Sequence, residues 1–495
     1  MPSQSHLLLF GVAVPVSPMN STLRNGIYRR TEGVDVSSGK RPDGADTVLE
    51  DLSDEILTQI LSRLTLKELG RTSVLSHRWR NLWKFTPGRL EFDARDGEVE
   101  IDRRRFKAWV NHILTLHQAQ QVDSFIVRVR VNWRACFIDK WISEALKKKA
   151  KNIEIDLSPN PTFHGGYAFP SLHKLFQSYG VRSAFGFLKS LKLVDVGIRD
   201  ETLRCFLASC MILESLTICG SRFTKNLNLV DQLPKLKHLE IACCYNMRRV
   251  GISVESLVSF TYNGPIIDFS FKKVPNLSEI TLAGKFCQSF LLDANKHVSY
   301  SLQLERLKLD LPFKLVEMPL RDAAYYDSPY LPQYSNLKYL EVTAMSIVGR
   351  SLLFFTKLVE ACPLLRKFRI EVKYTLCPKL EPAVLLPETS ASDAPIFQHE
   401  NLKLVELAGY LGCPSDEEFL THLLKIAPSL EMVTIDTEND FYRLSTEYNF
   451  LVVQSWFSDE SELPDCVYAM SRMEAIELAE EMQPKFPQNT QLVII

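Results

Sequence analysis

The sequence has almost no net charge, because its 58 Lys and Arg residues are matched by 59 Asp and Glu residues. A chain at −1 has no long-range field to attract nucleic acid or an anionic membrane, so neither is an expected partner. No apolar run reaches the roughly 18 residues that a bilayer-spanning helix needs. These absences argue against the nucleic-acid-binding and membrane-spanning classes of protein.

The sequence also lacks the motifs of common enzyme and metal sites. It contains no Gly-rich phosphate loop, no G-x-S-x-G elbow, no H-E-x-x-H and no kinase signature. The eleven cysteines show no C-x-x-C spacing, and the pair Cys243 and Cys244 has no His or Cys at ligand spacing nearby. Scattered cysteines of odd number are typical of reduced thiols in an intracellular protein. We expect no catalytic residue, no metal and no cofactor, and a nuclear or cytoplasmic protein.

Residues 1–46 precede any regular pattern. The apolar run from Leu7 to Val16 has the length of a signal peptide, but it lacks a basic flank before it and a clear cleavage site after it. Residues 17–46 are rich in Ser, Gly, Pro and charge. We therefore expect residues 1–46 to form a disordered leader.

A short helical module is predicted at residues 47–93. Ser53 followed by Asp54 and Glu55 is typical of a helix start. Apolar residues then recur on a wide helical stripe, and two further helices are expected from about Leu66 to Trp83. About 40 residues cannot bury so many large apolar side chains internally. The surplus predicts a partner surface or docking onto the rest of the chain.

The stretch Leu52 to Asp93, LSDEILTQILSRLTLKELGRTSVLSHRWRNLWKFTPGRLEFD, resembles the F-box of plant F-box proteins. It matches the family pattern L-P-D-x-(L/I)-L-x-x-I-L-S-R-L followed by R-T-S-V-L-S-x-R-W-R-x-L-W, with Ser53 and Thr65 where the family usually has Pro. The resemblance implies docking onto the Skp adaptor, and through it a cullin, of a Skp–cullin–F-box ubiquitin ligase. An amphipathic stripe does not say which face it buries, so Leu61 and Leu75 have equal claims to the module's own core. The residues carried over to the adaptor contact are Leu52, Ile56, Leu57, Ile60, Leu61, Leu64, Val74, Leu75, Trp79 and Trp83.

Beyond residue 94, after a helical entry segment, one apolar template recurs ten times at intervals of 20 to 37 residues. It is the strand segment L-x-x-L-x-L of a leucine-rich repeat, with irregular spacing. Pro234, Pro275, Pro363 and Pro428 each stand two residues before a copy, where they mark the turn into the strand. The copies are Leu188/Leu191/Leu193, Leu213/Leu216/Ile218, Leu236/Leu239/Ile241, Leu257/Phe260/Tyr262, Leu277/Ile280/Leu282, Leu304/Leu307/Leu309, Leu337/Leu340/Val342, Leu365/Phe368/Ile370, Leu402/Val405/Leu407 and Leu430/Val433/Ile435.

Helical patterns alternate with these strands, so the fold class is α/β: a three-helix F-box followed by an irregular right-handed leucine-rich-repeat solenoid over residues 94–396. The residues between the apolar positions are predicted to face the concave surface and to meet a protein substrate. For any one of them, a solvated strand face is the commoner role. These substrate-binding candidates are Lys189, Lys192, Lys237, His238, Glu240, Glu305, Arg306, Lys308, Arg366, Lys367 and Arg369.

Residues 397–436 resemble the FBD domain that closes many plant F-box/leucine-rich-repeat proteins. The pattern is a strand at Leu402 to Leu407, a G-Y-x-G turn, an acidic helix start and an A-P-x-L-x-x-(M/V)-x-I strand ending at Ile435. Residues 437–495 are expected to cap the solenoid, with a helix at Met473 to Met482 and a strand at Leu492 to Ile495.

The function predicted from the sequence is that of a non-catalytic substrate-recognition subunit of a ubiquitin ligase, which binds the Skp adaptor through the F-box and a target protein through the repeats. Two alternatives remain open at this point. One is a leucine-rich-repeat scaffold that acts outside any ligase, for which Ser53 and Thr65 are the support. The other is a small-molecule receptor of the F-box type. The identity of the substrate cannot be deduced from the sequence.

Overall fold

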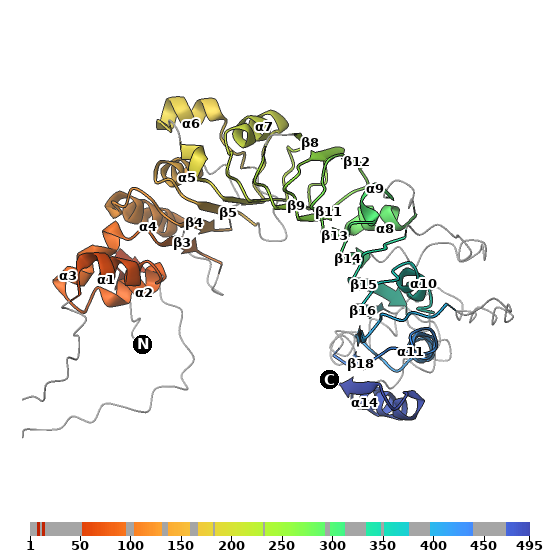
Figure 1. The fold of residues 1–495 in the computed structure, drawn as a ribbon. Helices are drawn as coiled ribbons and strands as arrows, with labels where there is room; N and C mark the ends of the chain where they lie inside the picture. Colours follow the sequence, from red (N-terminus) through yellow and green to blue (C-terminus); the bar gives the residue numbers. More distant parts are fainter. Residues whose placement is uncertain are drawn as a thin grey trace, which may run out of the picture. The chain divides into compact units, whose positions relative to one another are not determined.

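The computed structural model describes residues 7–9, 12–14, 52–95, 103–130, 137–158, 167–181, 184–230, 233–292, 298–311, 333–347, 351–375, 397–438 and 472–495. The chain divides into two units. The first comprises Met1–Gly197 and Ser209–Leu213, and the second comprises Ile198–Ala208 and Glu214–Ile495. Both units contain the alternating strands and helices that the sequence predicts (Figure 1).

The first unit starts with three short helices and continues as a parallel sheet whose strands follow chain order, β3-β4-β5-β6. Helices α4, α5 and α6 lie on one side of these strands (Figure 1). Its elements are α1 (Asp54–Leu61), α2 (Leu66–Thr72), α3 (His77–Leu82), a 3₁₀ helix (Trp83–Phe85), β3 (Arg89–Asp93), α4 (Arg103–Leu116), β4 (Ser124–Arg128), α5 (Phe137–Lys147), β5 (Asn152–Asp156), α6 (Leu172–Tyr179), a 3₁₀ helix (Ala184–Phe187) and β6 (Ser190–Val194).

The second unit continues the same architecture in the strand order β7-β9-β11-β13-β14-β15-β16-β17-β18-β19, and helices α8, α10 and α11 lie on one side of it (Figure 1). Its elements are α7 (Asp200–Ala208), β7 (Ser215–Cys219), β8 (Asn226–Val230), β9 (His238–Ala242), β10 (Arg249–Ser253), β11 (Ser259–Asn263), β12 (Asp268–Phe271), β13 (Glu279–Ala283), α8 (Gly284–Leu292), α9 (Val298–Ser301), β14 (Arg306–Leu311), β15 (Tyr339–Ile347), α10 (Phe354–Glu360), β16 (Lys367–Thr375), β17 (Leu404–Ala408), α11 (Pro414–Ile426), β18 (Met432–Asp436), α14 (Arg472–Glu481), a 3₁₀ helix (Gln483–Lys485) and β19 (Gln491–Ile494).

The ten-copy template is confirmed, because all thirty of its residues are at most 2% exposed. Equivalent residues pair in parallel register from strand to strand; Leu239, for example, lies opposite Leu216 on one side and Phe260 on the other. Stacking places the large apolar side chains of each repeat against those of its neighbours, which builds one continuous core along each unit. The prediction of a leucine-rich-repeat solenoid is therefore correct.

The prolines stand in tight turns that precede the strands. Pro234 is the second residue of a four-residue turn that closes with a hydrogen bond from Leu236 N–H to the Leu233 carbonyl, at 3.2 Å. Pro275, Pro363 and Pro428 occupy the same position in turns closed at 3.1, 3.0 and 3.3 Å. Proline suits this position because its fixed φ matches the second residue of such a turn.

A second, outer parallel sheet in the order β12-β10-β8 was missing from the sequence-based prediction. Its strands follow β7, β9 and β11 and have the alternating buried pairs Leu227/Leu229 and Val250/Ile252, continued by the half-buried pair Phe269/Phe271. The sequence of each strand does alternate between apolar and polar residues. Each strand lies between two template copies, however, where a leucine-rich repeat usually has a helix. In these repeats the outer layer is a strand instead.

Asparagine side chains join successive repeats just before the strands. Asn276, Asn336 and Asn401 each precede the first Leu of a template copy and donate a side-chain hydrogen bond to a carbonyl of the preceding repeat, at 2.7, 2.6 and 3.0 Å. The amide thereby satisfies a carbonyl that the turn leaves unpaired.

We expect Asn336→Ala to destabilise the second unit by about 1 kcal/mol, the usual net value of one such hydrogen bond. Hydrogen-exchange mass spectrometry of β14 and β15 is the suitable measurement, since it reads the local free energy of opening. Asn228→Ala is the matched control, because Asn228 is exposed on β8 and its loss is expected to change stability by less than about 0.5 kcal/mol. Equal exchange in both variants would contradict the inter-repeat role.

The FBD-like segment folds as β17, α11 and β18, as predicted, and its turn is organised by the buried carboxylate of Asp416. One oxygen of Asp416 accepts the backbone N–H groups of Leu411, Gly412 and Cys413 at 3.0, 3.1 and 3.3 Å, and the other accepts the hydroxyl of Tyr374 on β16. Burial raises the pKa of Asp416 to about 6, although these donors oppose the shift. The segment therefore has a structural role as the last repeats of the array, followed by the predicted terminal helix α14 and strand β19.

In the expected leader, the structure describes only a short antiparallel pair, β1 (Leu7–Leu9) and β2 (Val12–Val14). The rest of residues 1–46 lies outside the described residues, so the expectation of disorder there remains a prediction.

Candidate protein-interaction surfaces

The two departures from the F-box pattern both stand at helix starts. Ser53 is the N-cap of α1 and accepts the Ile56 N–H, at 3.4 Å. Thr65 is the N-cap of α2 and forms a capping box with Glu68: the Glu68 N–H donates to the Thr65 hydroxyl at 3.3 Å, and the Glu68 carboxylate accepts the Thr65 N–H at 2.8 Å. Hydroxyl side chains are among the preferred N-caps, so both replacements preserve the helices. The two departures therefore leave the helices of the module formed, and the alternative of a scaffold that acts outside any ligase stays a prediction.

The apolar residues carried over from the F-box resemblance separate into a core and a surface. Leu57, Leu61, Trp79 and Trp83 are at most 5% exposed and form the interior of the helical module. Leu52 and Leu64 are half-buried. The rest of the set is exposed to solvent: Ile56 at 46%, Ile60 at 38%, Val74 at 78% and Leu75 at 60%. Of the two residues left open by the sequence, Leu61 belongs to the core and Leu75 to the surface.

These four exposed side chains, Ile56, Ile60, Val74 and Leu75, are named the apolar F-box surface. Ile56 and Ile60 are one helical turn apart on α1, whereas Val74 and Leu75 follow the end of α2. Arg78 on α3 donates to the Asp54 carboxylate at 2.7 Å and to the Leu52 carbonyl at 2.5 Å, which fixes the start of α1 against α3. Four exposed large aliphatic side chains on so small a module are typical of a protein interface.

The F-box helices connect to the first repeat without a linker. The Lys84 carbonyl accepts the N–H groups of Gln118 and Ala119 at 2.7 and 3.1 Å, and the Pro87 carbonyl accepts that of Asp123 at 2.8 Å. His117 Nε2 lies 3.0 Å from the Thr86 carbonyl and must carry the proton there, because a carbonyl only accepts. Burial, with nearby Lys148, lowers the pKa of His117 to about 4, so the ring is neutral at pH 7.

Gly88 has no room for a side chain at this junction. A Cβ atom on Gly88 would lie 2.3 Å from the Ser62 carbonyl oxygen and 2.8 Å from its Cα, and these are backbone atoms that cannot rotate away. The absence of a side chain therefore allows the segment before β3 to cross the end of α1 in direct contact.

We expect Gly88→Ala to destabilise the first unit by about 2 kcal/mol, because the two backbones must separate. Urea unfolding followed by tryptophan fluorescence is the measurement, since Trp79, Trp83 and Trp141 are all buried in this unit. Gly186→Ala is the matched control, because a Cβ there meets no atom within 4 Å. A urea midpoint of unfolding that is unchanged in both variants would show that the contact is dispensable.

On the helix-free face of the first unit, an ion-pair network covers the strands. Arg128 on β4 makes a two-pronged contact with Glu154 on β5, at 2.8 and 3.0 Å, and reaches Glu91 on β3 at 2.6 Å. Burial opposes ionisation of Glu154, but the hydrogen bonds from Arg128 and the nearby Lys192 hold its pKa below the ordinary value. The network leaves each of these charges with an opposite neighbour.

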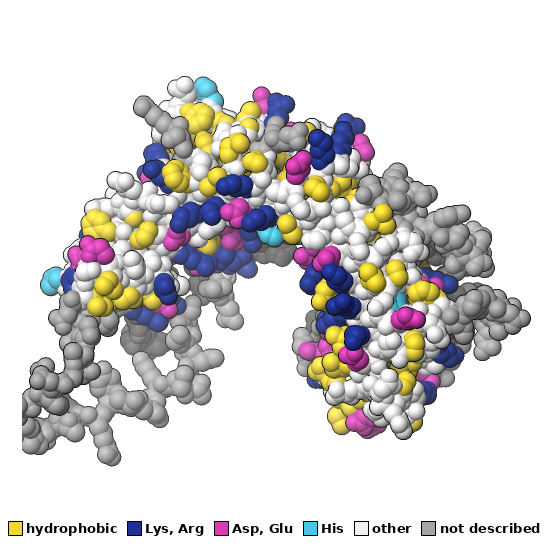
Figure 2. Space-filling view, viewed as in Figure 1, with side chains coloured by type: hydrophobic (Ala, Val, Ile, Leu, Met, Phe, Trp, Pro, Cys, Tyr) yellow, Lys and Arg dark blue, Asp and Glu magenta, His cyan; other side chains and the backbone are white. Residues whose placement is uncertain are grey.

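The second unit shows the same pairing along β14 to β17. Lys308 contacts Glu341 at 2.7 Å, Lys367 contacts Glu406 at 3.2 Å, and Arg369 pairs with Glu406. Figure 2 shows the resulting mixture of dark-blue and magenta side chains on the side of these strands away from α8 and α10. The charges are therefore largely neutralised by one another within the protein.

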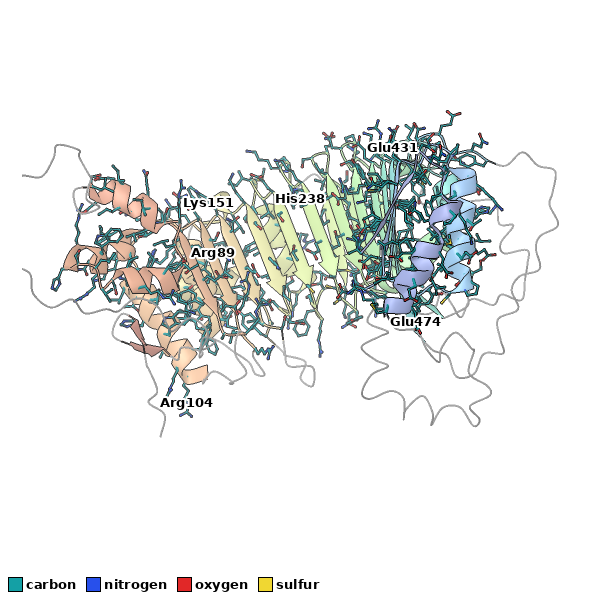
Figure 3. All side chains as sticks on the ribbon, turned by 90° about the horizontal axis from the view of Figure 1, so that it is seen from below. Arg89, Arg104, Lys151, His238, Glu431 and Glu474 are labelled. Atoms are coloured by element: carbon teal, nitrogen blue, oxygen red, sulfur yellow. The ribbon has the colours of Figure 1, made fainter. Side chains whose placement is uncertain are left out.

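The substrate-binding candidates from the sequence fall into two groups. Those at the second and third variable places of the template lie on the helix-free strand face, whereas those at the first variable place precede the strand. The edge at which strands begin is marked in Figure 3 by His238 and Glu431, both of the second unit. On the strands lie Lys192, His238, Glu240, Arg306, Lys308, Lys367 and Arg369; just before them lie Lys189, Lys237, Glu305 and Arg366.

Many of these candidates already contact neighbouring repeats. Lys192 lies 3.5 Å from Glu154, the Arg306 guanidinium is 4.5 Å from the centre of the Tyr339 ring, and His238 Nδ1 is 2.8 Å from the Ser259 hydroxyl. Before the strands, Lys237 pairs with Glu214 at 3.6 Å and Glu305 with Lys338 at 2.7 Å. Their role in substrate binding remains a prediction.

The loops that follow β7 and β9 contain a group of exposed residues that sequence reasoning missed. Together with the residue before α7 they form what is named the strand-exit patch. Basic and aromatic residues cluster in these loops in the sequence, and that cluster could have indicated a binding surface. The prediction considered only the strand positions. The patch comprises Arg199, Arg222, Phe223, Lys225, Tyr245 and Arg248.

The described cysteines lie mostly inside the repeats. Cys210, Cys244 and Cys362 are at most 1% exposed, and burial raises the pKa of the Cys210 thiol to about 12. Within the described part of the chain, no cluster of His, Cys, Asp or Glu is arranged to hold a metal ion. Among the same residues, no helix is long and apolar enough to cross a membrane.

Comparison with known proteins agrees with both architectural predictions. A family model described as the F-box domain matches residues 49–87, and one described as the At1g61320/AtMIF1 LRR domain matches residues 113–475, well over half of the chain. The FBD-associated F-box protein At1g66310 of Arabidopsis thaliana is 24% identical over 84% of this chain and 95% of its own length. The F-box/FBD/LRR-repeat protein At3g51530 of the same species is 25% identical over 79% of this chain and 85% of its own length.

The names of both relatives combine an F-box with an FBD, and one of the names adds leucine-rich repeats. The chain belongs to the plant F-box/FBD/leucine-rich-repeat protein family.

Proposed function

We propose that this protein is the substrate-recognition subunit of a Skp–cullin–F-box ubiquitin ligase, which docks onto a Skp-type adaptor through the apolar F-box surface. Membership of the F-box family supports adaptor binding in general. The observation that carries the specific proposal is that Ile56, Ile60, Val74 and Leu75 are exposed while the module's own core is complete without them. Four exposed large aliphatic side chains on a module of this size favour a partner that removes them from water.

The protein itself takes no chemical step in this proposal. It binds a target through its repeat array and holds the target near the charged ubiquitin-conjugating enzyme, which raises the effective concentration of target lysines there. The proposal also places the protein in the nucleus or cytoplasm, where Skp adaptors and cullins assemble; a fluorescent fusion of the full chain tests that part.

Co-expression of the full chain with a Skp-type adaptor and a cullin tests the proposal directly. A stable complex that contains the three chains in equal amounts is the expected result, measured by size-exclusion chromatography with light scattering. Proximity labelling of ubiquitinated proteins by the wild type, compared with an adaptor-binding variant, then identifies targets. A chain that stays monomeric beside excess adaptor would overturn the proposal.

A further inference from the structure

The cations of the strand-exit patch, all within the second unit, differ from those of the strand face because no ion pair joins them to an acidic side chain of the described residues. Arg199, Arg222, Lys225 and Arg248 are exposed, and within the described residues none of their side chains forms an ion pair. Two described carboxylates of the adjoining repeats bond to other groups, although Asp200 keeps its negative charge while it does so. Asp200 accepts the backbone N–H groups of Lys225 and Asn226 at 2.7 and 3.1 Å, and Asp268 pairs with Arg249 at 3.0 Å.

Three of these cations stand next to one another on successive repeats. The Arg248 N–H donates to the Lys225 carbonyl at 2.7 Å, so these two residues occupy adjacent rows of the array. The Lys225 N–H also donates to Asp200. Arg199, the residue before Asp200, therefore lies in the repeat that precedes that of Lys225. Adjacent rows are about 5 Å apart, and like charges at that spacing destabilise a fold. All three cations are exposed.

Exposed aromatic side chains stand among the cations. Phe223 is 41% exposed and Tyr245 is 76% exposed. The Asn246 side chain donates to the Arg222 carbonyl at 2.8 Å, which holds the loop with Tyr245 against the loop with Phe223. Figure 2 shows dark-blue side chains, with some magenta ones, close to yellow ones in the region that Figure 1 labels β8 and β12. Arg and Tyr are enriched among the residues that dominate binding energy at protein interfaces.

We propose that the strand-exit patch binds an acidic segment of the target protein that also carries an aromatic or aliphatic side chain. Carboxylates of the segment neutralise Arg199, Lys225 and Arg248, which relieves their mutual repulsion, and its apolar side chain covers Phe223 and Tyr245. The identity of the bound segment as a ligase target rests on the proposed function. The preference of the surface for an acidic segment does not depend on the proposed function.

The experiment selects peptides from a phage-displayed library of random 12-residue sequences on the full-length protein. The test variant is Arg199→Ala/Lys225→Ala/Arg248→Ala. The matched control is Lys235→Ala/Lys272→Ala/Lys273→Ala, which removes the same charge from exposed residues elsewhere in the second unit. Selected peptides are then labelled with fluorescein, and their affinity for the three proteins is measured by anisotropy at two salt concentrations.

The expected result is enrichment of peptides rich in Asp and Glu with an aromatic or aliphatic residue, bound at least tenfold more weakly by the test variant and unchanged by the control. The melting temperature of the test variant is expected to equal or exceed that of the wild type, because repulsion is removed. Absence of acidic enrichment, equal binding by the test variant, or equal loss in the control would overturn the proposal. Tighter binding of a single-stranded oligonucleotide through the same three residues would also overturn it.

Adaptor capture by the same three proteins separates this inference from the proposed function. The strand-exit patch belongs to the second unit, whereas α1 to α3 belong to the first, so the test variant should retain the adaptor in full. If the wild type does not capture the adaptor, the ligase role is refuted, but the peptide result can still be interpreted. Intact adaptor capture with no acidic peptides would refute the patch alone.

Discussion

Ile60→Asp is expected to reduce capture of the Skp-type adaptor at least 100-fold without unfolding the protein. Ile60 is 38% exposed on α1, so the free protein tolerates a charge there at little cost in stability. In the complex, the carboxylate would lie between apolar side chains with no partner, which costs several kcal/mol. Surface plasmon resonance with immobilised adaptor measures the affinity, and thermal unfolding checks the fold.

Two further variants make this result specific. Met211→Asp places the same charge on another exposed apolar side chain of the first unit and is expected to leave adaptor affinity unchanged. Leu61→Asp buries a charge in the module's core and is expected to unfold it, with a lower melting temperature as well as lost binding. Undiminished capture by Ile60→Asp would show that the adaptor contacts a different face.

Asp416→Ala is expected to destabilise the FBD-like segment by about 4 kcal/mol. The substitution leaves three backbone N–H groups and the Tyr374 hydroxyl without their acceptor in a buried site. Each unsatisfied buried donor costs about 1–3 kcal/mol, and partial access of water reduces the sum. Hydrogen-exchange mass spectrometry over β16 to β18 reads the loss. Wild-type protection in this variant would contradict the organising role of Asp416.

Asp416→Asn is the conservative control and is expected to retain most of the stability, since its side-chain oxygen can accept the backbone donors and its amide can donate to Tyr374. The two proteins should also differ in pH dependence. Burial raises the pKa of Asp416 to about 6, above its unfolded value, so the wild type loses stability as pH rises from about 4 through 6. Relative to Asp416→Asn, the wild type should gain roughly 1 kcal/mol between pH 7 and pH 5.

The buried framework of the repeats was predictable because it depends on a short pattern. An apolar residue at each of three fixed positions suffices to identify a strand that is buried on one face, and ten copies in series leave no other fold. The sequence also indicated that helices alternate with these strands, and α7, α10 and α11 are among those helices. The F-box was recognisable because Arg78, Trp79 and Trp83 occur at the spacing of the family's sequence pattern.

The surfaces were less predictable because burial and exposure depend on partners that are distant in sequence. Leu61 and Leu75 look alike in an amphipathic stripe, yet the packing of α1 against α3 buries the first and leaves the second exposed. The strand-face charges were equally ambiguous: Arg369 meets Glu406 only because two repeats align in register. Ser53 and Thr65 appeared as departures from a pattern until their hydroxyls were seen to cap helices.

The strict pairing of each strand with its immediate neighbours also affects how relatives of this protein can diversify. The loops after β7 and β9 contact adjacent rows of the array, and their sequences place no demand on α1 to α3. Mutations can therefore accumulate in such loops during evolution while the docking helices stay under separate selection. A gene family built on this scaffold can vary the proteins that it recognises and keep one shared partner.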